Sequence, residues 1–245
     1  MPSAIGTPTY AAQNSNILND GSADSPRGYA ISANADYTFT ATGPSRVRVS
    51  APLAARTVTL PTTGIKTGYV AEVVVSGATK ENYVVVKSSG AEEVGGTNVG
   101  RISSNGTLTV VALQDVPTTA AHWEISNVQE SGEFVPARET NNAAVVATVN
   151  ITAVVMNFSR VGKTVTVSGS CNCNASSAGN ADFYVTLPIA TNIVSRVYGV
   201  CANKSSAGVA SGGPVVTIND NAHIFVAIAN LSVNTVTFSF TYRIA

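Results

Sequence analysis

The two histidines of the chain, His122 and His223, are the natural candidates for the general base of a hydrolase. Asp220 stands three residues before His223, so an acid and a base lie close together just before a predicted strand. However, the core-like apolar run 224–226 follows directly, and the sequence has no Gly-x-Ser-x-Gly elbow to present a nucleophile. We therefore interpret Asp220 as a turn residue beside a half-buried histidine, and we expect no catalytic triad.

Carboxylate pairs could carry out a second kind of chemistry, the cleavage of a glycosidic bond. This reaction needs two carboxyl groups held roughly 5–10 Å apart across a groove. Residues 141–245 offer only Asp182 and Asp220. The other candidates lie in polar segments and are interpreted as solvated charges: Glu92 and Glu93 in a glycine-rich turn, and Glu130, Glu133 and Glu139 in a charged stretch. We assign no catalytic residue and expect that the protein is not an enzyme.

Metal binding has two possible sources in the sequence. Asp20 and Asp24 resemble the beginning of a calcium loop, but the bidentate glutamate of such a loop is missing, so ion binding at this segment stays open. Cys171 and Cys173 stand two residues apart and share one face of a predicted strand, while Cys201 lies on another strand. No fourth ligand stands at a usual zinc spacing, so we interpret the cysteines as small buried hydrophobic side chains and assign no metal site.

Cofactor, nucleic acid and carbohydrate binding have little support in the residue pattern. The sequence contains no glycine-rich phosphate motif and no basic patch with interleaved aromatic residues. We therefore expect no cofactor and no nucleic acid partner. Trp123 and Tyr198 could stack on a sugar ring, but a lone tryptophan in an alternating strand is more often a core residue.

The charge content also limits the possible partners. Of 245 residues only 11% are charged, against roughly 25% in a typical soluble domain, and 14 basic residues balance 14 acidic ones. Such a chain has no long-range field to attract phosphates or an anionic membrane. Residues 141–245 carry only five basic and two acidic side chains. An uncharged β-surface associates readily, so we expect this region to be covered in part by further copies of the chain, with a monomer as the alternative.

The first 30 residues are rich in Ser, Asn, Ala and Gly and cannot form a core of their own. We expect residues 1–30 to be an extended arm that anchors the protein. They lack the basic start and the continuous apolar stretch of a signal peptide, and the apolar run 143–156 is too short and too polar to span a bilayer. We therefore expect assembly in a cytoplasm and no membrane insertion.

The candidate residues discussed above are positioned by predicted β-strands, and the sequence gives no signal for a helix. Short alternating segments over 31–126 predict one β-sandwich module, the polar stretch 127–142 predicts a linker, and 143–245 predicts a C-terminal jelly roll or β-sandwich. Its strands are expected near 145–158, 163–173, 181–187, 193–202, 214–218, 223–229 and 235–244. The fold class is therefore all-β, with two β-sandwich or jelly-roll domains and an extended N-terminal arm.

Two local features refine this prediction. Apolar positions change from odd numbers at Val149 and Ile151 to even numbers at Val154 and Met156, which predicts a β-bulge near 153–155. The pair Asn105-Gly106 precedes an alternating segment and predicts a hairpin turn.

Three segments of the C-terminal region carry a family resemblance: Phe158–Gly169, Thr186–Ala190 and Thr235–Ile244. Together they resemble the C-terminal β-domain of tailed-bacteriophage fibres and related virion proteins, over roughly the last hundred residues. A second resemblance rests on the segments Arg56–Pro61, Asn82–Lys87 and Ala121–Trp123, which look like small β-modules of phage tail and fibre proteins.

The resemblance implies a structural virion protein that projects from the particle, either a short fibre or a receptor-binding protein. It implies a homotrimer, attached to capsid or tail proteins through residues 1–30, with loops near 174–180 and 204–213 in contact with a host glycan or surface receptor. The alternative is a capsid head fibre or decoration protein that cements the shell. A free carbohydrate-binding module is a third class, but it would need a secretion signal.

Overall fold

The computed structural model describes residues 29–136, 138–139, 149–175, 181–189, 197–205, 210–216, 223–228 and 233–244. Within these residues the protein is all-β, as predicted, and its single helical element is the three-residue 3-10 turn η1 (Ala120–His122). The chain divides into two compact units. The first contains the described residues up to Gly96 together with Gly100–Asn127, and the second contains Thr97–Val99 together with the described residues from Val128 onward. The expected arm lies outside the described residues except for its last two positions, which open β1.

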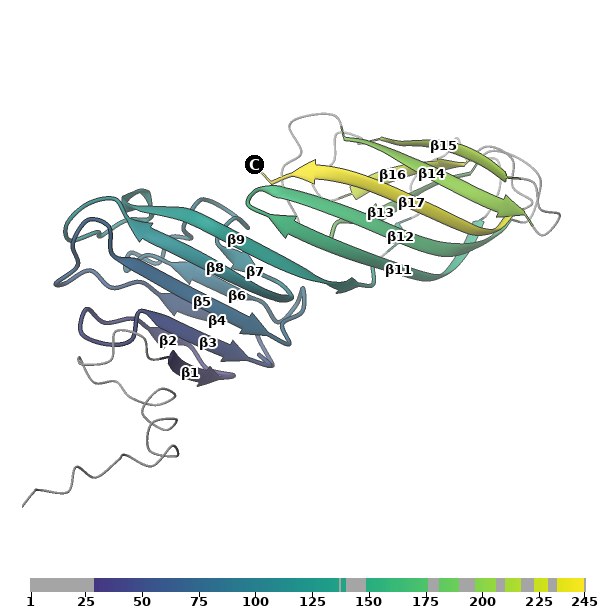
Figure 1. Ribbon diagram of the computed structural model, residues 1–245. Coiled ribbons are helices and arrows are strands. Elements are labelled where there is room, and N and C mark those ends of the chain that lie inside the picture. Colours follow the sequence, from purple (N-terminus) through teal and green to yellow (C-terminus); the bar gives the residue numbers. More distant parts are fainter. Residues whose placement is uncertain are drawn as a thin grey trace, which may run out of the picture. The chain divides into compact units, whose positions relative to one another are not determined.

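The first unit consists of two facing sheets. One contains β1 (Tyr29–Ala33), β3 (Arg46–Ser50), β5 (Val70–Ser76), β8 (Asn105–Ala112) and the start of β9 (Trp123–Phe134); the other contains β2 (Tyr37–Thr38), β4 (Arg56–Thr59), β6 (Val84–Lys87) and β7 (Arg101–Ile102). Figure 1 shows β2, β4 and β6 behind β3, β5 and β8. Six successive strands alternate between the sheets, and the neighbours within each sheet run parallel. The chain therefore winds as a short two-sided coil, which β7 and β8 end by pairing antiparallel with β6 and β5.

The corners after the parallel strands have a common backbone conformation. Asn34, Ala51 and Gly77 directly follow β1, β3 and β5, and their φ values are 52°, 42° and 72°. The strand register places them one above another, and the ladder continues from Asn34 N to Ser50 O (3.3 Å) and from Ala51 N to Ser76 O (2.8 Å). A left-handed residue at each corner turns the chain out of one sheet toward the other while its amide stays bonded.

Alternation within each strand forms the core of the first unit. The side chains between the sheets are Val47, Val49, Val73, Val75, Leu108 and Val110 from one sheet and Val58, Val84, Val86 and Ile102 from the other, and each is at most 2% exposed. Burial of such a side chain stabilises the fold by about 1.5–3 kcal/mol. The core is therefore built from β-branched residues that repeat with a period of two.

The prediction of a hairpin turn at Asn105-Gly106 is wrong. Both residues belong to β8, and Gly106 pairs with Val75 of β5. The Asn105 Oδ1 atom accepts a hydrogen bond from the amide of Gly77 (2.7 Å). This side chain therefore bonds the amide of the third corner, as Ser50 O and Ser76 O bond those of the first two. The preceding strand, β7, lies in the other sheet, and the chain crosses between sheets here instead of reversing within one.

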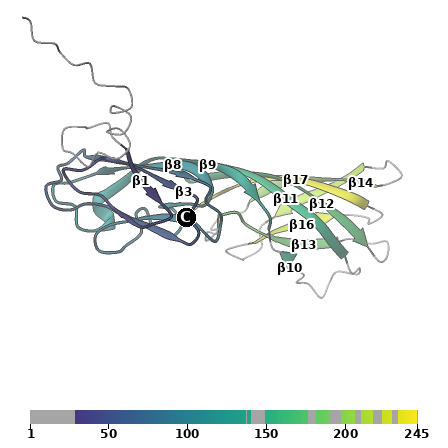
Figure 2. The ribbon, with the colours of Figure 1, turned by 90° about the horizontal axis from the view of Figure 1, so that it is seen from below.

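The second unit is antiparallel throughout its described pairings. Its strands are the later part of β9, β10 (Arg138–Glu139), β11 (Val149–Val161), β12 (Thr164–Ala175), β13 (Ala181–Thr186), β14 (Tyr198–Ser205), β15 (Ala210–Val216), β16 (His223–Ile228) and β17 (Val233–Arg243), in the spatial order β9-β11-β12-β17-β14-β15-β16-β13-β10. Figure 2 shows β13 and β10 in a layer beneath β11 and β12. The seven strands expected over 143–245 correspond to β11–β17 with shifts of a few residues. The predicted bulge is confirmed, because the register between β11 and β12 shifts between Thr152 and Val155.

The prediction of a linker over 127–142 is wrong for residues 127–134. Residues 127–134 form the later part of β9, and from Gln129 onward they pair with β11 from Val161 back to Met156. The polar composition of this stretch reflects a strand with an exposed polar face, and not an irregular connection. The division between the units falls within β9, at Asn127 and Val128.

Candidate interaction surfaces and buried polar sites

His122 braces a turn in the first unit. Its Nδ1 atom accepts hydrogen bonds from the amides of Thr118 (3.1 Å) and Thr119 (3.4 Å) and lies 3.1 Å from the Gln114 Nε2 atom. The ring therefore supplies an acceptor to backbone donors that precede η1. The other triad candidates cannot be joined to it, since Asp220 and the side chain of His223 lie outside the described residues. In the strand register Asp182 pairs with Ala227 and His223 with Thr186, so Asp182 and His223 are four residues apart along the sheet, about 13 Å.

Glu92 and Glu93 are not simply solvated, and our interpretation of them is corrected. A carboxylate oxygen of Glu92 accepts a hydrogen bond from the amide of Ala120 (3.0 Å). Glu93 has a side chain only 12% exposed and pairs with Arg101 at 3.0 Å, and the Arg101 guanidinium lies 4.7 Å from the ring centre of Tyr83. These carboxylates hold loops of the first unit in place. Glu133 is exposed on β9, and the side chain of Glu139 lies outside the described residues.

Glu130 is the largest departure from the sequence interpretation, because its side chain is fully buried. It lies on β9 opposite Arg160 of β11, and the Arg160 Nη1 atom is 3.0 Å from the Glu130 Oε1 atom. Arg160 is equally buried and donates two further hydrogen bonds, from Nη2 to Val99 O (2.6 Å) and from Nε to Gly162 O (2.8 Å). A single guanidinium thus ties β9, β11, the turn after β11 and the segment Thr97–Val99 of the second unit.

Sequence alternation held a signal for this pair. Met156, Phe158 and Arg160 are every second residue of β11, and all three face the interior. Val128 and Glu130 have the same spacing on β9. Charge alone suggested that Glu130 is solvated, whereas strand period places it inside, and the strand period is right.

The three segments that carry the fibre resemblance pack against one another. β12 and β17 pair from Thr164 with Arg243 to Cys171 with Val236. The Tyr242 hydroxyl donates to Ile189 O (2.9 Å) and accepts from Ile189 N (3.1 Å), which attaches the Thr186–Ala190 segment to β17. Burial raises the pKa of the Tyr242 hydroxyl, so it stays protonated and keeps both bonds.

Gly169 shapes the aromatic stack beneath these strands. The rings of Phe238, Phe240 and Tyr242 follow each other along β17 with centroid distances of 6.3 and 6.2 Å. A Cβ atom at Gly169 would lie 2.5 Å from the Phe238 ring and 2.9 Å from Val155 O. Only glycine lets the ring lie against β12 at this point.

The cysteines and Trp123 occupy core positions. Cys171 and Cys201 are buried thiols on β12 and β14, opposite Val236 and Phe238 of β17, as the alternation predicted; the side chain of Cys173 lies outside the described residues. No group of three or more His, Cys, Asp or Glu side chains is gathered for a metal ion in the part of the chain that the structure describes.

Trp123 is 4% exposed and meets Tyr69 edge-on at a centroid distance of 6.3 Å, so it offers no platform for a sugar. Burial raises the pKa of Tyr69 to about 12. The side chain of Tyr198 lies outside the described residues.

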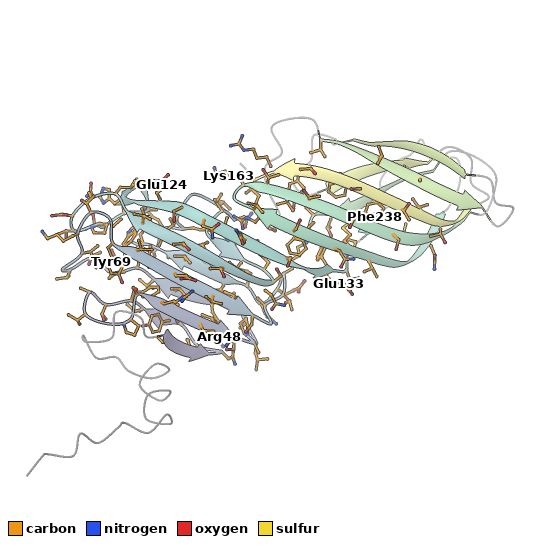
Figure 3. The ribbon with its side chains drawn as sticks, in the orientation of Figure 1. Arg48, Tyr69, Glu124, Glu133, Lys163 and Phe238 are labelled. Atoms are coloured by element: carbon orange, nitrogen blue, oxygen red, sulfur yellow. The ribbon has the colours of Figure 1, made fainter. Side chains whose placement is uncertain are left out.

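The outer face of the first sheet combines valines with charged residues. Val70 (45% exposed), Val74, Val111 and Leu113 (50% exposed) lie on β5, on β8 and just after β8, between Arg48 on β3 and Glu124 on β9. Figure 3 labels Arg48 and Glu124 toward opposite ends of this sheet. Arg46 and Glu72 form an ion pair on the same face at 2.7 Å.

The outer face of the second unit contrasts with this arrangement. Four adjacent strands, β11, β12, β17 and β14, expose two valines, Val161 (65% exposed) and Val200 (70% exposed). Their other exposed side chains are mainly hydroxyl, amide and small ones: Asn157, Ser159, Thr166, Ser168, Thr237, Ser239, Thr241 and Ala202. Several of the hydroxyls bond within the sheet, for example Ser239 to Val167 O at 3.1 Å and Thr237 to Ala202 O at 3.3 Å. Among the side chains that the structure describes, the charged ones on this face are Arg243 at the end of β17 and Glu133 on the neighbouring β9, which stands beside Asn157.

The expected receptor loops are described only in part. Asn174 and Ala175 belong to β12, residues 204–205 to β14 and residues 210–213 to β15, so the prediction of loops is wrong for these positions. The remaining residues of both loops, and the segment Asp20–Asp24, lie outside the described residues.

The comparisons with known proteins give no further assignment. Neither models of protein families nor curated protein sequences match the chain. Within the described residues no helix has the length and apolar character needed to cross a membrane.

Proposed function

We propose that the chain is a structural, non-enzymatic protein of a bacteriophage particle, which projects from it as a short fibre or receptor-binding protein. The protein acts as a homotrimer. Residues 1–30 attach it to capsid or tail proteins, and the β-units are held outward. The alternative placement is the capsid shell, as a head fibre or decoration protein.

The observation that carries this proposal is the packing of the three segments that resemble phage fibre domains. They are separated in sequence, yet they form a paired and hydrogen-bonded set through β12, β17 and the Tyr242 contact with Ile189. Segments that are inherited as one domain are expected to be spatial neighbours. The resemblance therefore concerns one physical unit and not scattered short matches.

The surfaces of the protein support a role in assembly or display. A hydroxyl-bearing sheet face with few charges creates little long-range repulsion between copies that are brought close together. His122 and Glu92 each accept a hydrogen bond from a backbone amide, and Glu93 and Glu130 each pair with an arginine. Among the described carboxylate and histidine candidates, Glu133 alone has no such bond. The bonded groups support a scaffold role.

The test is the location of the protein in purified virus particles. Antibody labelling followed by reconstruction of the particles is expected to place it on the outside of the particle. Density at the tail tip supports a fibre, and density over the capsid lattice supports decoration. Absence from purified particles would contradict the proposal. Competition for host cells by the purified protein then separates receptor binding from cementing.

A further inference from the structure

The outer face of β3, β5, β8 and β9 in the first unit has the composition of a contact surface. We call it the Arg48–Glu124 face and define it by Arg48, Val70, Val74, Val111 and Glu124. Val70 and Val111 are direct cross-strand neighbours, and Val74 stands beside Arg48 in the register of β3 with β5. The antiparallel pairing that joins Leu113 N to His122 O places Glu124 next to Val111.

Exposed apolar side chains gather near the Glu124 end of this face. Val70 is 45% exposed, and Leu113, which follows Val111 on the same side, is 50% exposed. Toward the other end of the strands, Thr107 and Thr109 of β8 add methyl groups, and Glu72 of β5 stands beside Thr109. A flat sheet surface of this kind loses apolar area from water when another surface covers it, which favours association.

Two of the charged residues of the face pair with each other within the fold. Arg46 is neutralised by Glu72, its ion-pair partner on the next strand. Arg48 and Glu124 are exposed, lie on either side of β5 and β8, and make no hydrogen bond or ion pair with any part of the chain that the structure describes. One cation and one anion are thus left at opposite ends of the same sheet surface.

We propose that the Arg48–Glu124 face is a contact between copies of this chain, in which Arg48 of one copy pairs with Glu124 of another. A face with opposite charges at its two sides is complementary to itself. In the proposed homotrimer, a three-fold rotation that brings the Arg48 side of one copy to the Glu124 side of the next satisfies every such charge around the closed ring. The exposed side chains of Val70 and Leu113 supply affinity, and the charge pair sets the orientation and rejects the reversed one.

This inference rests on the oligomeric part of the proposed function, but it is tested separately from placement in a virus particle. The mass of the purified protein is measured by light scattering across a dilution series, for the wild type, for Arg48→Glu, for Glu124→Arg and for the double charge swap. Each single reversal opposes like charges in the contact and is expected to weaken assembly about tenfold or more. The double swap restores the opposite pairing and is expected to return the dissociation constant to within about threefold of the wild type.

Arg243→Glu is the matched control, because Arg243 is an exposed arginine on the outer face of the second unit, and its reversal leaves the mass unchanged. Val70→Ser removes apolar area without a change of charge and is expected to weaken assembly in its own right. A wild type that is monomeric at every concentration, single reversals without effect, or a double swap as weak as the single variants would each overturn the inference. None of these outcomes bears on whether the protein is found in particles, so the two proposals fail separately.

Discussion

The two units place their charged side chains in opposite positions. In the first unit the described core holds no charged residue, and the charges lie on the outer sheet face and at loops. In the second unit a charged pair, Glu130 with Arg160, is fully buried, while the described outer sheet face carries Glu133 and Arg243 among mainly uncharged side chains. An exposed charge can orient a partner, whereas a buried pair can only fix the chain's own elements. The contrast therefore agrees with the proposed contact on the surface of the first unit, whereas the buried pair fixes the register of strands in the second.

The largest expected effect comes from breaking the buried pair. Arg160→Met leaves the Glu130 carboxylate buried without its cation and removes donors from Val99 O and Gly162 O, so we expect a loss of about 3–5 kcal/mol in the free energy of unfolding. Chemical denaturation measures this loss. The double variant Arg160→Met with Glu130→Leu is expected to recover a large part of it, because no unpaired charge remains. Arg243→Met, in an exposed position, serves as control and is expected to change the stability little. An effect as small for Arg160→Met would contradict the structural role of the buried pair.

A second effect tests the packing around the aromatic stack. Gly169→Ala places a methyl group against the Phe238 ring and Val155 O, and overpacking of this kind is expected to cost about 1–3 kcal/mol. Combining it with Phe238→Leu should reduce the cost of the alanine, since the ring is the nearer obstacle. Thermal unfolding of the variants, with Ser170→Ala on the same strand as control, gives the coupling. Additive effects would show that the two positions do not meet.

Substitution of a corner residue in the first unit is expected to lower the free energy of unfolding by less. The Asn34 Oδ1 atom accepts hydrogen bonds from Leu53 N (2.7 Å) and from two nitrogens of Arg56, and Asn34 has a left-handed φ of 52°. Asn34→Ala loses the acceptor and strains the backbone, for about 1–2 kcal/mol in total. Asn34→Gly loses the acceptor alone, so its smaller effect on denaturant unfolding separates the two causes. Equal effects would assign the whole loss to the hydrogen bonds.

The smallest effect concerns a surface carboxylate and depends on pH. Hydrogen bonds from Lys66 and from Thr67 lower the pKa of Asp115 from its ordinary value of 3.8 to about 2. Because the folded-state pKa lies below the unfolded one, the stabilisation is complete above pH 4 and is lost as the pH falls toward 2. The stability difference between the wild type and Asp115→Asn should therefore shrink over this interval. A difference that stays constant from pH 6 to pH 2 would contradict the assignment.

In both units the sequence predicted the strands better than it predicted which strands pair. Alternation located β11–β17, the bulge between Thr152 and Val155, and the buried position of Cys171, because each of these is a local property of one strand. The parallel winding of the first unit follows from which strands pair across tens of residues, and alternation carries no such information. Asn105-Gly106 shows the limit, since the same pair favours a tight turn but also suits the start of a strand beside a corner.

The same limit applies to the candidate site residues: local alternation placed some of them correctly, and those that depend on distant strands were missed. Trp123 was correctly expected in the core from its place in an alternating strand. Glu130 was misplaced because its partner Arg160 lies 30 residues away, and a charged residue without a visible partner is normally solvated. The Arg48–Glu124 face was not recognised at all, because its members belong to four strands whose neighbours are fixed only by the fold.

The difference between the two outer faces is tested most directly by thiol labelling of the assembled protein. Thr107→Cys places a probe on the Arg48–Glu124 face, and Thr166→Cys places one on the hydroxyl face of the second unit, with the unaltered protein giving the background of its native cysteines. Labelling rates are compared at high concentration and at a dilution that dissociates the assembly. We predict that assembly slows labelling at Thr107→Cys and leaves Thr166→Cys unchanged. Equal rates in both states at Thr107→Cys, or protection at Thr166→Cys alone, would contradict the account.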